Sequence, residues 1–422
     1  MQKHKFFRAV GVNNLLIIAI MLMFSLFGSV FGMSEETIAF TLIIIPLAIS
    51  MGYDSIVGVL MCYVAAHVGF AGAMLNPFTI GIAQGLSGLP TFSGIGYRLF
   101  CWILLTVVAI IFTLIYANWV KKHPEKSIMY ELDQYWRDKR EEVSTEQSLA
   151  KSTIATWVVY GIIAAVLLVC AIAIPKTDIT VGLGSHRMVV FPIVAGCYIL
   201  LGFFAARKSA HHFILTLLLL TIVVLVIGVL GYGWYVMEIA GLFFAMGIAA
   251  GFAFSLRLDR IVRLFLEGCK DIMVAALVVG LAGGIIIILE DGKIIDTILY
   301  AVSQGFGDAG RVGTTGVMYV VQNLLNLIIP SGSAKAALTI PMMAEWSDLM
   351  GVSRQLTVLA FQFGDGFTNM ITPTSGVLIG VLGVARIPYA KWFKFIWKFL
   401  LALIILGFFL LLPPLFMPFA GF

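Results

Sequence analysis

Charged residues that lie in or beside long apolar runs are the first candidates for chemistry in this sequence. They are Glu35, Glu36, Lys335 and Asp365. An ionisable side chain at membrane depth is costly, and it usually serves a substrate or ion pathway. We therefore take Asp365, which is flanked by two glycines, as the first functional candidate.

The other three charged candidates each have two interpretations. Glu35 and Glu36 face different directions on a helix, and they could equally lie in a water-exposed loop, because 15–33 is by itself long enough to cross a bilayer. Lys335 could contact a substrate, or it could form an internal ion pair with Asp365 or with one of the two glutamates. The sequence leaves these alternatives open.

Two long apolar runs are interrupted by glycine, proline and small polar residues. The first break includes Asn76-Pro77-Phe78-Thr79 within 56–88, and the second includes Thr372-Pro373-Thr374-Ser375 within 355–385. A proline removes a backbone donor, and unpaired backbone inside a bilayer is tolerated only where it is buried in protein or lines a cavity. Helix N-termini attract carboxylates and C-terminal carbonyls attract cations. One break is more often a kink, but two at matching positions favour a binding site.

The composition shows what surrounds these breaks. Of 422 residues, 61% are hydrophobic and 12% are charged, and the mean hydropathy is +1.03. Soluble domains have about 45–50% apolar and about 25% charged residues. Continuous apolar runs of helix-spanning length also lack the alternation of barrel strands. The chain is therefore predicted to be an all-α polytopic membrane protein in a lipid bilayer, with no nucleic-acid partner.

Charge divides the chain into parts. A charged segment at 120–152 is predicted to be a cytoplasmic linker between a first repeat, 1–119, and a scaffold part, 153–256, which a second repeat, 257–422, follows. With the N-terminus inside, 20 lysines and arginines fall inside and 6 outside, which supports that orientation. The expected membrane segments are 56–88, 97–119, 153–174, 188–205, 213–232, 239–256, 271–290, 355–385 and 398–420, with re-entrant hairpins at about 12–51 and 314–350.

A weak internal repeat supports the hairpins. Pro46 and Pro341 are 295 residues apart, and Asn76 and Thr372 are 296 apart. The two copies would be inverted, which is common in secondary transporters. Chance matches and two full crossings in place of each hairpin are the alternatives.

At these breaks the sequence resembles a known family. FGMSEETIAF, GFAGAMLNPFTIGIAQGLSGLPTFSGIGYR, IPSGSAKAALTIPMMA and VLAFQFGDGFTNMITPTSGVLIGVLGVARIPYAKWFKF are similar to the YfcC-like branch of the anaerobic C4-dicarboxylate carrier (DcuC-like) family, in the ion transporter superfamily. The resemblance implies inverted repeats, re-entrant hairpins and an elevator motion against a dimeric scaffold. It also implies a substrate and ion site made of Ser34, Glu35, Glu36, Asn76, Pro77, Thr79, Ser331, Gly332, Ser333, Lys335, Asp365, Thr368, Asn369, Thr372, Thr374 and Ser375.

The chain departs from the family at its start. Gly283-Gly284 in 271–290 precedes the second hairpin, whereas the offset would put the counterpart before residue 1. The expectation is an N-terminally short member: a truncated product, a short natural form or a wrong start site. This leaves competent transport open.

The function expected from these features is ion-coupled transport, by symport or exchange, of a small amino acid, including a basic one of the arginine or ornithine type. Three acidic candidates against one basic candidate favour this over the alternative, a C4-dicarboxylate carrier. A channel, an intramembrane enzyme (for which His67 and Ser331 are a thin basis) and a non-transporting relic are the other classes. No catalytic residue and no cofactor are expected.

The coupling ion is expected to be Na⁺ or H⁺, with Asn76, Thr79, Asn369 and Thr374 as Na⁺ ligands, because hard cations prefer oxygen ligands. The expected partners are a small-molecule substrate and a second copy in a homodimer. The expected location is the cytoplasmic (inner) membrane of a prokaryote, with the N-terminus in the cytoplasm.

Overall fold

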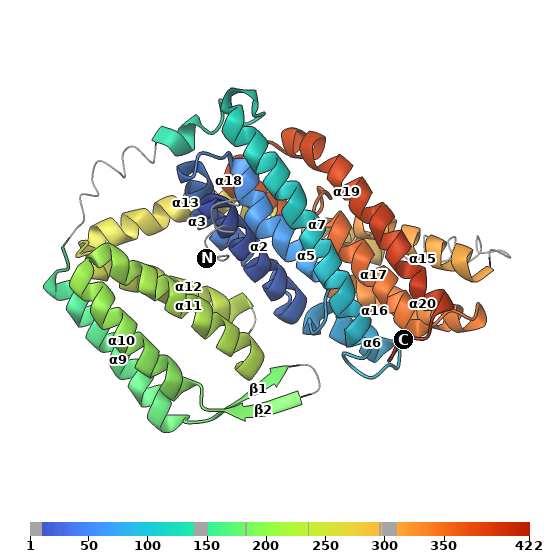
Figure 1. The fold of residues 1–422 in the computed structure, drawn as a ribbon, viewed down its shortest axis with the longest axis horizontal. Helices are drawn as coiled ribbons and strands as arrows, with labels where there is room; N and C mark the ends of the chain where they lie inside the picture. Colours follow the sequence, from blue (N-terminus) through green and yellow to red (C-terminus); the bar gives the residue numbers. More distant parts are fainter. Residues whose placement is uncertain (1–10, 139–150, 182–183, 235, 295–296, 298–309) are drawn as a thin grey trace, which may run out of the picture. The chain divides into compact units, whose positions relative to one another are not determined.

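The computed structural model describes the chain except for residues 1–10, 139–150, 182–183, 235, 295–296 and 298–309. It divides into two compact units, which are described separately. Unit 1 consists of residues 1–140 and 271–422, and unit 2 of residues 141–270. Helices make up most of both units (Figure 1).

The first part of unit 1 is a helix pair, an interrupted helix and a long helix. Its elements are α2 (Val12–Phe31), α3 (Thr37–Ser50), α4 (Ser55–Val59), a π-helical turn (Leu60–Val64), α5 (Ala65–Ala71), a second π-helical turn (Pro77–Gly81), α6 (Ile82–Leu86) and α7 (Ile95–Lys122). The helix stops after Ala71 and restarts at Asn76, whose side chain accepts a hydrogen bond from the Phe78 backbone N–H at 2.9 Å. Pro77 suits the first helical position because its missing N–H would be unpaired there anyway. The break predicted at Asn76-Pro77 is therefore present.

The last part of unit 1 follows the same order. Its elements are α15 (Gly310–Asn326), α16 (Gly332–Leu349), α17 (Arg354–Thr368), α18 (Gly376–Ala385), α19 (Tyr389–Leu411) and the short α20 (Pro413–Phe416). Ser353 and Ser375 cap α17 and α18, each accepting a backbone N–H with its hydroxyl. Residues 369–375 separate these two helices, so the second predicted break is also present.

The two interrupted helices meet at the centre of unit 1. Every residue of α5 is buried, and so is every residue of α17 from Gln355 onward. A Cβ atom on Gly366 would lie 2.5 Å from Ala71, so only glycine permits this approach of α17 to α5. Gln362 of α17 donates its side-chain N–H to the Phe70 carbonyl of α5 at 2.5 Å.

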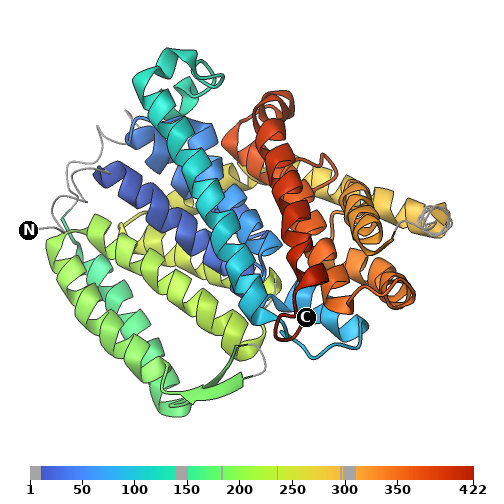
Figure 2. The ribbon, with the colours of Figure 1, turned by 45° about the vertical axis from the view of Figure 1, so that its right-hand side comes forward.

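The long helices α7 and α19 lie side by side on unit 1 (Figures 1 and 2). The rings of Phe112 and Phe399 stack at a centroid distance of 4.0 Å, and the Tyr97 hydroxyl donates to the Leu410 carbonyl at 2.6 Å. Their outer faces carry large exposed apolar side chains, among them Phe409 at 60%. Apolar faces of this kind suit contact with lipid.

The charged segment after α7 packs against unit 1 as far as it is described. It begins with a 3₁₀ turn (Pro124–Lys126). Asp133 accepts the Ser55 backbone N–H at 2.8 Å, and Lys391 donates to the Ile128 carbonyl at 2.6 Å. Residues 124–138 are therefore part of the folded unit.

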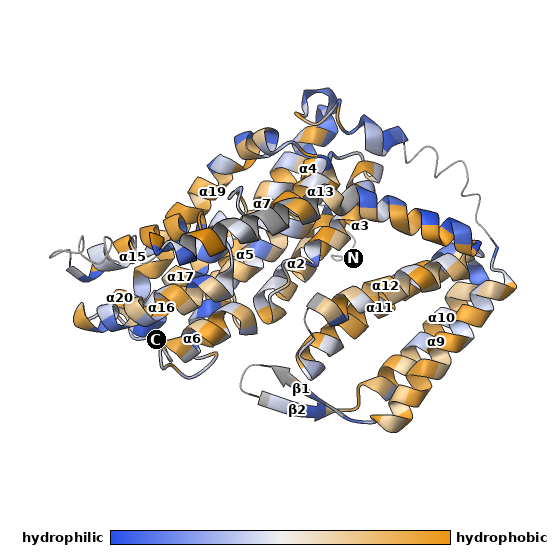
Figure 3. Ribbon diagram, turned by 180° about the vertical axis from the view of Figure 1, so that it is seen from behind, coloured by the Kyte–Doolittle hydropathy of each residue, from blue (hydrophilic) through white to orange (hydrophobic). Residues whose placement is uncertain are grey.

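Unit 2 is a helical layer with one small β-hairpin. It contains α9 (Ile154–Ala173), strands β1 (Thr177–Val181) and β2 (Gly184–Met188), α10 (Phe191–Lys208), α11 (Ala210–Tyr232), α12 (Val236–Ala253) and the first part of α13 (Leu258–Asp291). The strands are antiparallel, with Thr177 opposite Met188. This hairpin departs from the all-α prediction. Figure 3 shows that hydrophobic residues predominate on α9 to α12.

Six helices among the described residues are long and apolar enough to cross a membrane. They are 12–31, 95–122, 154–173, 191–208, 210–232 and 389–416. The chain is therefore a multi-pass membrane protein. The last span begins at residue 389 and not at the expected 398, because the lysines and tryptophans between residues 391 and 398 lie inside α19. Helix α2 is itself a candidate span, and the re-entrant hairpins stay a prediction.

Candidate functional site

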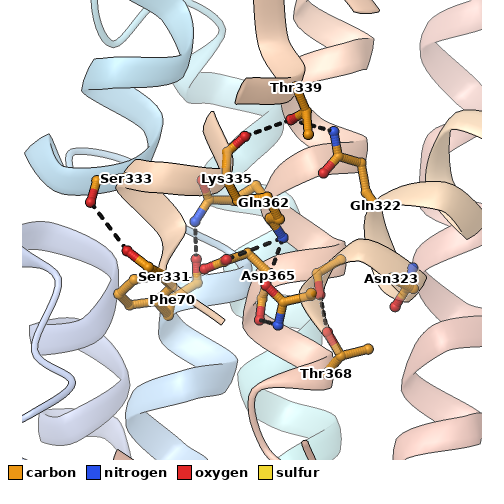
Figure 4. A network of polar contacts seen from close by, with 12 residues as sticks. Phe70, Gln322, Asn323, Ser331, Ser333, Lys335, Thr339, Gln362, Asp365 and Thr368 are labelled. Carbon is orange, nitrogen blue, oxygen red and sulfur yellow. Dashed lines mark hydrogen bonds and ion pairs between the residues drawn. The ribbon is translucent and has the colours of Figure 1, made fainter. Parts of the chain in front are cut away.

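A buried ion pair lies at the centre of unit 1. Lys335 lies in the first turn of α16 and Asp365 in the last turn of α17. The Lys335 Nζ is 3.1 Å from the Asp365 Oδ1, and neither side chain has any exposed surface (Figure 4). One of the two roles expected for Lys335, an internal ion pair with Asp365, is thus present.

The end of α15 joins the ion pair. Lys335 donates to the side-chain oxygen of Asn326 at 2.8 Å, and the Asn326 amide group donates to the Asp365 carbonyl at 3.4 Å. The Phe361 ring lies 4.8 Å from the ammonium and offers a cation–π contact. The ammonium is therefore held by several groups, whereas the Asp365 carboxylate has Lys335 as its ionic partner and accepts no hydrogen bond from the described residues.

The first break of unit 1 reaches this ion pair through Gly332. A Cβ atom on Gly332 would lie 2.8 Å from the Thr79 Cγ2 and 3.0 Å from the Asp365 Oδ2. Thr79 belongs to the π-helical turn after the first break. The Thr79 hydroxyl is buried and has no hydrogen-bond partner in the described part of the chain. Thr79, which follows the first break, and Asp365, which lies four residues before the second, therefore both lie next to Gly332 at the start of α16.

A layer of amide and hydroxyl side chains surrounds the ion pair (Figure 4). Gln322 donates to the Thr339 hydroxyl at 3.0 Å, and Thr339 donates to the Lys335 carbonyl at 2.8 Å. Thr368 donates to the backbone at 2.5 Å, one turn earlier in α17. The side-chain carbonyl oxygens of Gln322 and Gln362 are buried and accept no hydrogen bond from the described residues. Such orphaned oxygens are rare in folded proteins and suit a bound cation or donor.

Aromatic side chains donate hydrogen bonds to the backbone carbonyls of the second break. Tyr63 donates to the Asn369 carbonyl at 2.8 Å and Trp392 to the Met370 carbonyl at 2.9 Å. Tyr389 donates to the next carbonyl, that of Ile371, at 2.6 Å. The broken backbone is therefore satisfied by protein, as the membrane environment requires.

The loop between α15 and α16 sits on the second break. Thr372 and Thr374 both donate to the Leu327 carbonyl, at 3.3 Å and 2.8 Å. The Ser331 and Ser333 hydroxyls lie 3.5 Å apart at the start of α16.

The first break is held in a similar way by the end of α2. Ser29 accepts the backbone N–H groups of Met74 and Leu75 with its carbonyl, both at 3.1 Å. A Cβ atom on Gly32 would come within 2.6 Å of the Asn76 side chain. Asn76 therefore packs against the tip of the α2–α3 pair, while Pro77 itself is exposed.

Glu35 and Glu36 lie in the turn between α2 and α3, and they do not contact the ion pair. The Ser34 backbone N–H donates to Glu36 at 3.1 Å, and Glu35 is exposed. Among the described residues, neither they nor Ser34 makes a hydrogen bond or ion pair with Lys335 or Asp365. Site membership for these three residues stays a prediction.

The four expected Na⁺ ligands differ in whether their side-chain oxygens make hydrogen bonds. Asn76 already accepts from Phe78, and Thr374 donates to Leu327. Thr79 and the side-chain oxygen of Asn369 are buried without a hydrogen-bond partner in the described chain. These two oxygens make no hydrogen bond in the described chain, whereas Asn76 and Thr374 each make one and keep lone pairs that could also face a cation.

Sequence reasoning missed three amide residues of this site: Gln322, Asn326 and Gln362. The signal was present, since an amide inside an apolar helix is a polar group at membrane depth. Gln322 and Asn326 are also four residues apart, which places them on one face of a helix.

Comparison with known proteins identifies the family. The family model DcuC, described as "C4-dicarboxylate anaerobic carrier", matches residues 8–205 and 203–414. The chain is 34% identical over 395 residues to the Escherichia coli protein named "Putative basic amino acid antiporter YfcC", covering 91% of this chain and 66% of that protein. It is 29% identical over 398 residues to an uncharacterized protein of Haemophilus influenzae, covering 94% of this chain and 67% of the relative. The chain thus spans about two thirds of each relative.

One solved structure is also similar. The crystal structure of the Alcanivorax borkumensis YdaH transporter matches with a TM-score of 0.43 and 16% identity, over 94% of this chain and 78% of that one. The likeness is too low to carry an argument. The chain belongs, on its sequence, to the YfcC-like branch of the DcuC family of C4-dicarboxylate anaerobic carriers, whose members are transporters and not enzymes.

Proposed function

We propose that this chain is an ion-coupled secondary transporter of a small amino acid, with basic amino acids of the arginine or ornithine type as the first class to test. The observation that carries the proposal is the buried Lys335–Asp365 ion pair, which lies between the two broken helices beside Gly332 and Thr79. The Escherichia coli relative, named "Putative basic amino acid antiporter YfcC", points to the same class.

A zwitterionic solute can replace the contacts that the ion pair now makes. Its ammonium group takes the place of Lys335 at Asp365, and its carboxylate meets Lys335 and the N-terminus of α16. That helix is 18 residues long, and its N-cap Ser331 makes no side-chain cap hydrogen bond. The first N–H groups of a helix and its dipole favour a carboxylate. Both charges thus keep a partner during binding, which avoids an uncompensated buried charge.

A second candidate substrate is a C4-dicarboxylate. The description of the matching family model favours it, and so does the buried ammonium of Lys335. Two carboxylates, however, would meet Asp365, a like charge that disfavours their binding. Protonation of Asp365 would remove that repulsion and would couple dicarboxylate uptake to H⁺.

The remaining parts of the proposal concern coupling and motion. We propose Na⁺ or H⁺ as the coupling ion, with Thr79 and Asn369 as the first Na⁺ ligands. The proposal also includes an elevator motion, re-entrant hairpins, a homodimer, and an inner-membrane location with a cytoplasmic N-terminus. The same order of elements in both parts of unit 1, a helix pair, an interrupted helix and a long helix, supports an inverted repeat.

Exchange across proteoliposomes tests the proposal. Vesicles loaded with unlabelled arginine should take up labelled arginine, and those loaded with buffer alone should take up much less. Asp365→Asn should abolish exchange. The matched control is Asp348→Asn, because Asp348 is an exposed acid of α16 that pairs with Arg354 instead.

The outcomes separate the substrate classes. Exchange of labelled succinate, with none of arginine or other amino acids, would overturn the amino-acid proposal in favour of the dicarboxylate carrier. Full exchange by the Asp365→Asn variant would remove Asp365 from the site. Voltage-clamp currents of channel size through the wild-type protein would contradict a carrier altogether.

A further inference from the structure

A second buried charge in unit 1 lacks an ionic partner. Arg98 lies in the first turn of α7, and its side chain is only 1% exposed. Its Nη2 donates to the side-chain oxygen of Gln355 at 3.1 Å, whereas Nε and Nη1 have no hydrogen-bond partner among the described residues. No described carboxylate pairs with it within 4.0 Å. A guanidinium remains charged in proteins, so the orphaned N–H groups call for an acceptor.

The polar neighbours of Arg98 are neutral and already engaged. The Gln355 oxygen also accepts from the Gln84 amide group at 3.1 Å. Gln84 donates further to the Ser93 carbonyl at 2.9 Å, and Gln355 donates to the Ser93 hydroxyl. These groups hold one edge of the guanidinium in place but leave its charge unbalanced. Burying an unpaired charge is strongly unfavourable, which indicates that an anion completes the site.

Aromatic residues from the end of the described chain cover this charge. The Phe422 ring lies 5.7 Å from the Arg98 Cζ, and the Phe419 ring lies 4.6 Å from that of Tyr97. Gly94, which precedes α7 with a φ of 71°, packs against Phe422. The Phe422 ring is therefore among the groups that enclose the guanidinium.

We propose that Arg98 is the receptor of a small monovalent anion that accepts hydrogen bonds from its free N–H groups. The chemistry is a single negative charge, which a halide from the medium or the carboxylate of a small organic acid can supply. This site is separate from the ion pair. Gln355, which holds Arg98, lies in the first turn of α17, and Asp365 lies ten residues further along, about 15 Å at the helical rise.

Anion-dependent stability of the purified full chain tests this proposal. Melting temperatures are measured at constant ionic strength while chloride or acetate replaces the bulky Hepes sulfonate. Wild type should gain several degrees along a saturating curve, because an anion bound only to the folded state stabilises it. Arg98→Gln should lose the gain. The matched control is Arg354→Gln, because Arg354 is an exposed arginine with its own acidic partner and its loss should leave the gain intact.

The two sources of the anion are told apart by comparing the salts. A gain with chloride alone assigns a halide, and a gain with acetate at lower concentration than chloride assigns a carboxylate. An unsaturable gain, or an equal gain in Arg98→Gln, would overturn the proposal. Should Arg98→Gln fail to fold, crystals of the wild type grown in bromide or in acetate decide the matter. An anomalous bromide peak, or acetate density in crystals grown in acetate, within hydrogen-bond distance of Arg98 supports the site, and the absence of both refutes it.

Discussion

The Nζ of Lys335 and the Oδ1 of Asp365 lie 3.1 Å apart with both side chains fully enclosed, and the two residues come from different helices. An ion pair in this position is neutral as a unit, so it can remain buried while the site is empty. A charged solute must separate the pair or add to it.

Removing one partner of the pair should cost more stability than removing both. Asp365→Asn and Lys335→Met should each lower the free energy of unfolding by about 3–5 kcal/mol, because each leaves an uncompensated buried charge. The double variant should recover most of that loss. Thermal or denaturant unfolding of the four proteins gives the coupling energy. Equal and additive losses would show that the two charges do not interact.

A methyl group at Gly332 should disable the site. Gly332→Ala would place a Cβ atom 2.8 Å from Thr79 and 3.0 Å from Asp365, so either neighbour must move. We expect a stability loss of about 1–3 kcal/mol and a larger loss of exchange activity. Gly85→Ala is the matched control, because its Cβ atom would meet nothing within 4 Å. Normal exchange by Gly332→Ala would show that this contact does not shape the site.

The Thr79 hydroxyl should matter if Na⁺ is the coupling ion. Thr79→Val keeps the shape of the side chain but removes the orphaned oxygen. Uptake by this variant should need several-fold more Na⁺ than the wild type, while Thr79→Ser should keep the wild-type dependence. Initial rates of uptake at increasing Na⁺ concentration measure this. If all three proteins respond alike to Na⁺, Thr79 is not a ligand.

Stability should fall as the pH rises through the range in which Asp133 titrates. Burial, with the nearby Asp54 charge, raises the pKa of Asp133 from 3.8 to about 6 although Ser55 and Arg137 oppose this. The folded state therefore binds the proton more tightly than the unfolded state. Stability is greatest below about pH 4 and decreases up to about pH 6, by at most about 3 kcal/mol.

Paired variants test this pH dependence. Asp133→Asn should flatten the change in melting temperature between these pH values. Glu131→Gln, which alters an exposed acid two residues away, should leave the change as in the wild type. Asp54 is also buried with a raised pKa, so some slope should persist in Asp133→Asn. A slope unaffected by Asp133→Asn would contradict the prediction.

The sequence predicted the two breaks because proline and glycine act locally on the backbone. Pro77 and Gly376 begin helical segments where the sequence placed the interruptions. The pairing of Lys335 with Asp365 was one of several alternatives, because which charges meet depends on packing between distant segments. The close approach at Gly366 illustrates this, since its neighbour Ala71 is far away in sequence.

The β-hairpin and the amide residues were missed for different reasons. Residues 177–188 are short and polar between two apolar helices, so they lacked the length on which the membrane segments were recognised. Gln322 and Gln362 were missed because they lie inside continuous helices and not in the glycine- and proline-containing breaks that marked Asn76 and Asn369. Their role becomes apparent only when Thr339 and Phe70 are seen as their partners.

The aromatic donors on the second break have a consequence for ion binding. Three successive carbonyls, those of Asn369, Met370 and Ile371, already accept hydrogen bonds from Tyr63, Trp392 and Tyr389. Each carbonyl oxygen keeps a second lone pair, so the aromatic donors satisfy the unwound backbone in the absence of an ion and still leave it able to accept one. The side-chain oxygens of Gln322 and Gln362, which accept no hydrogen bond from the described residues, have both lone pairs available.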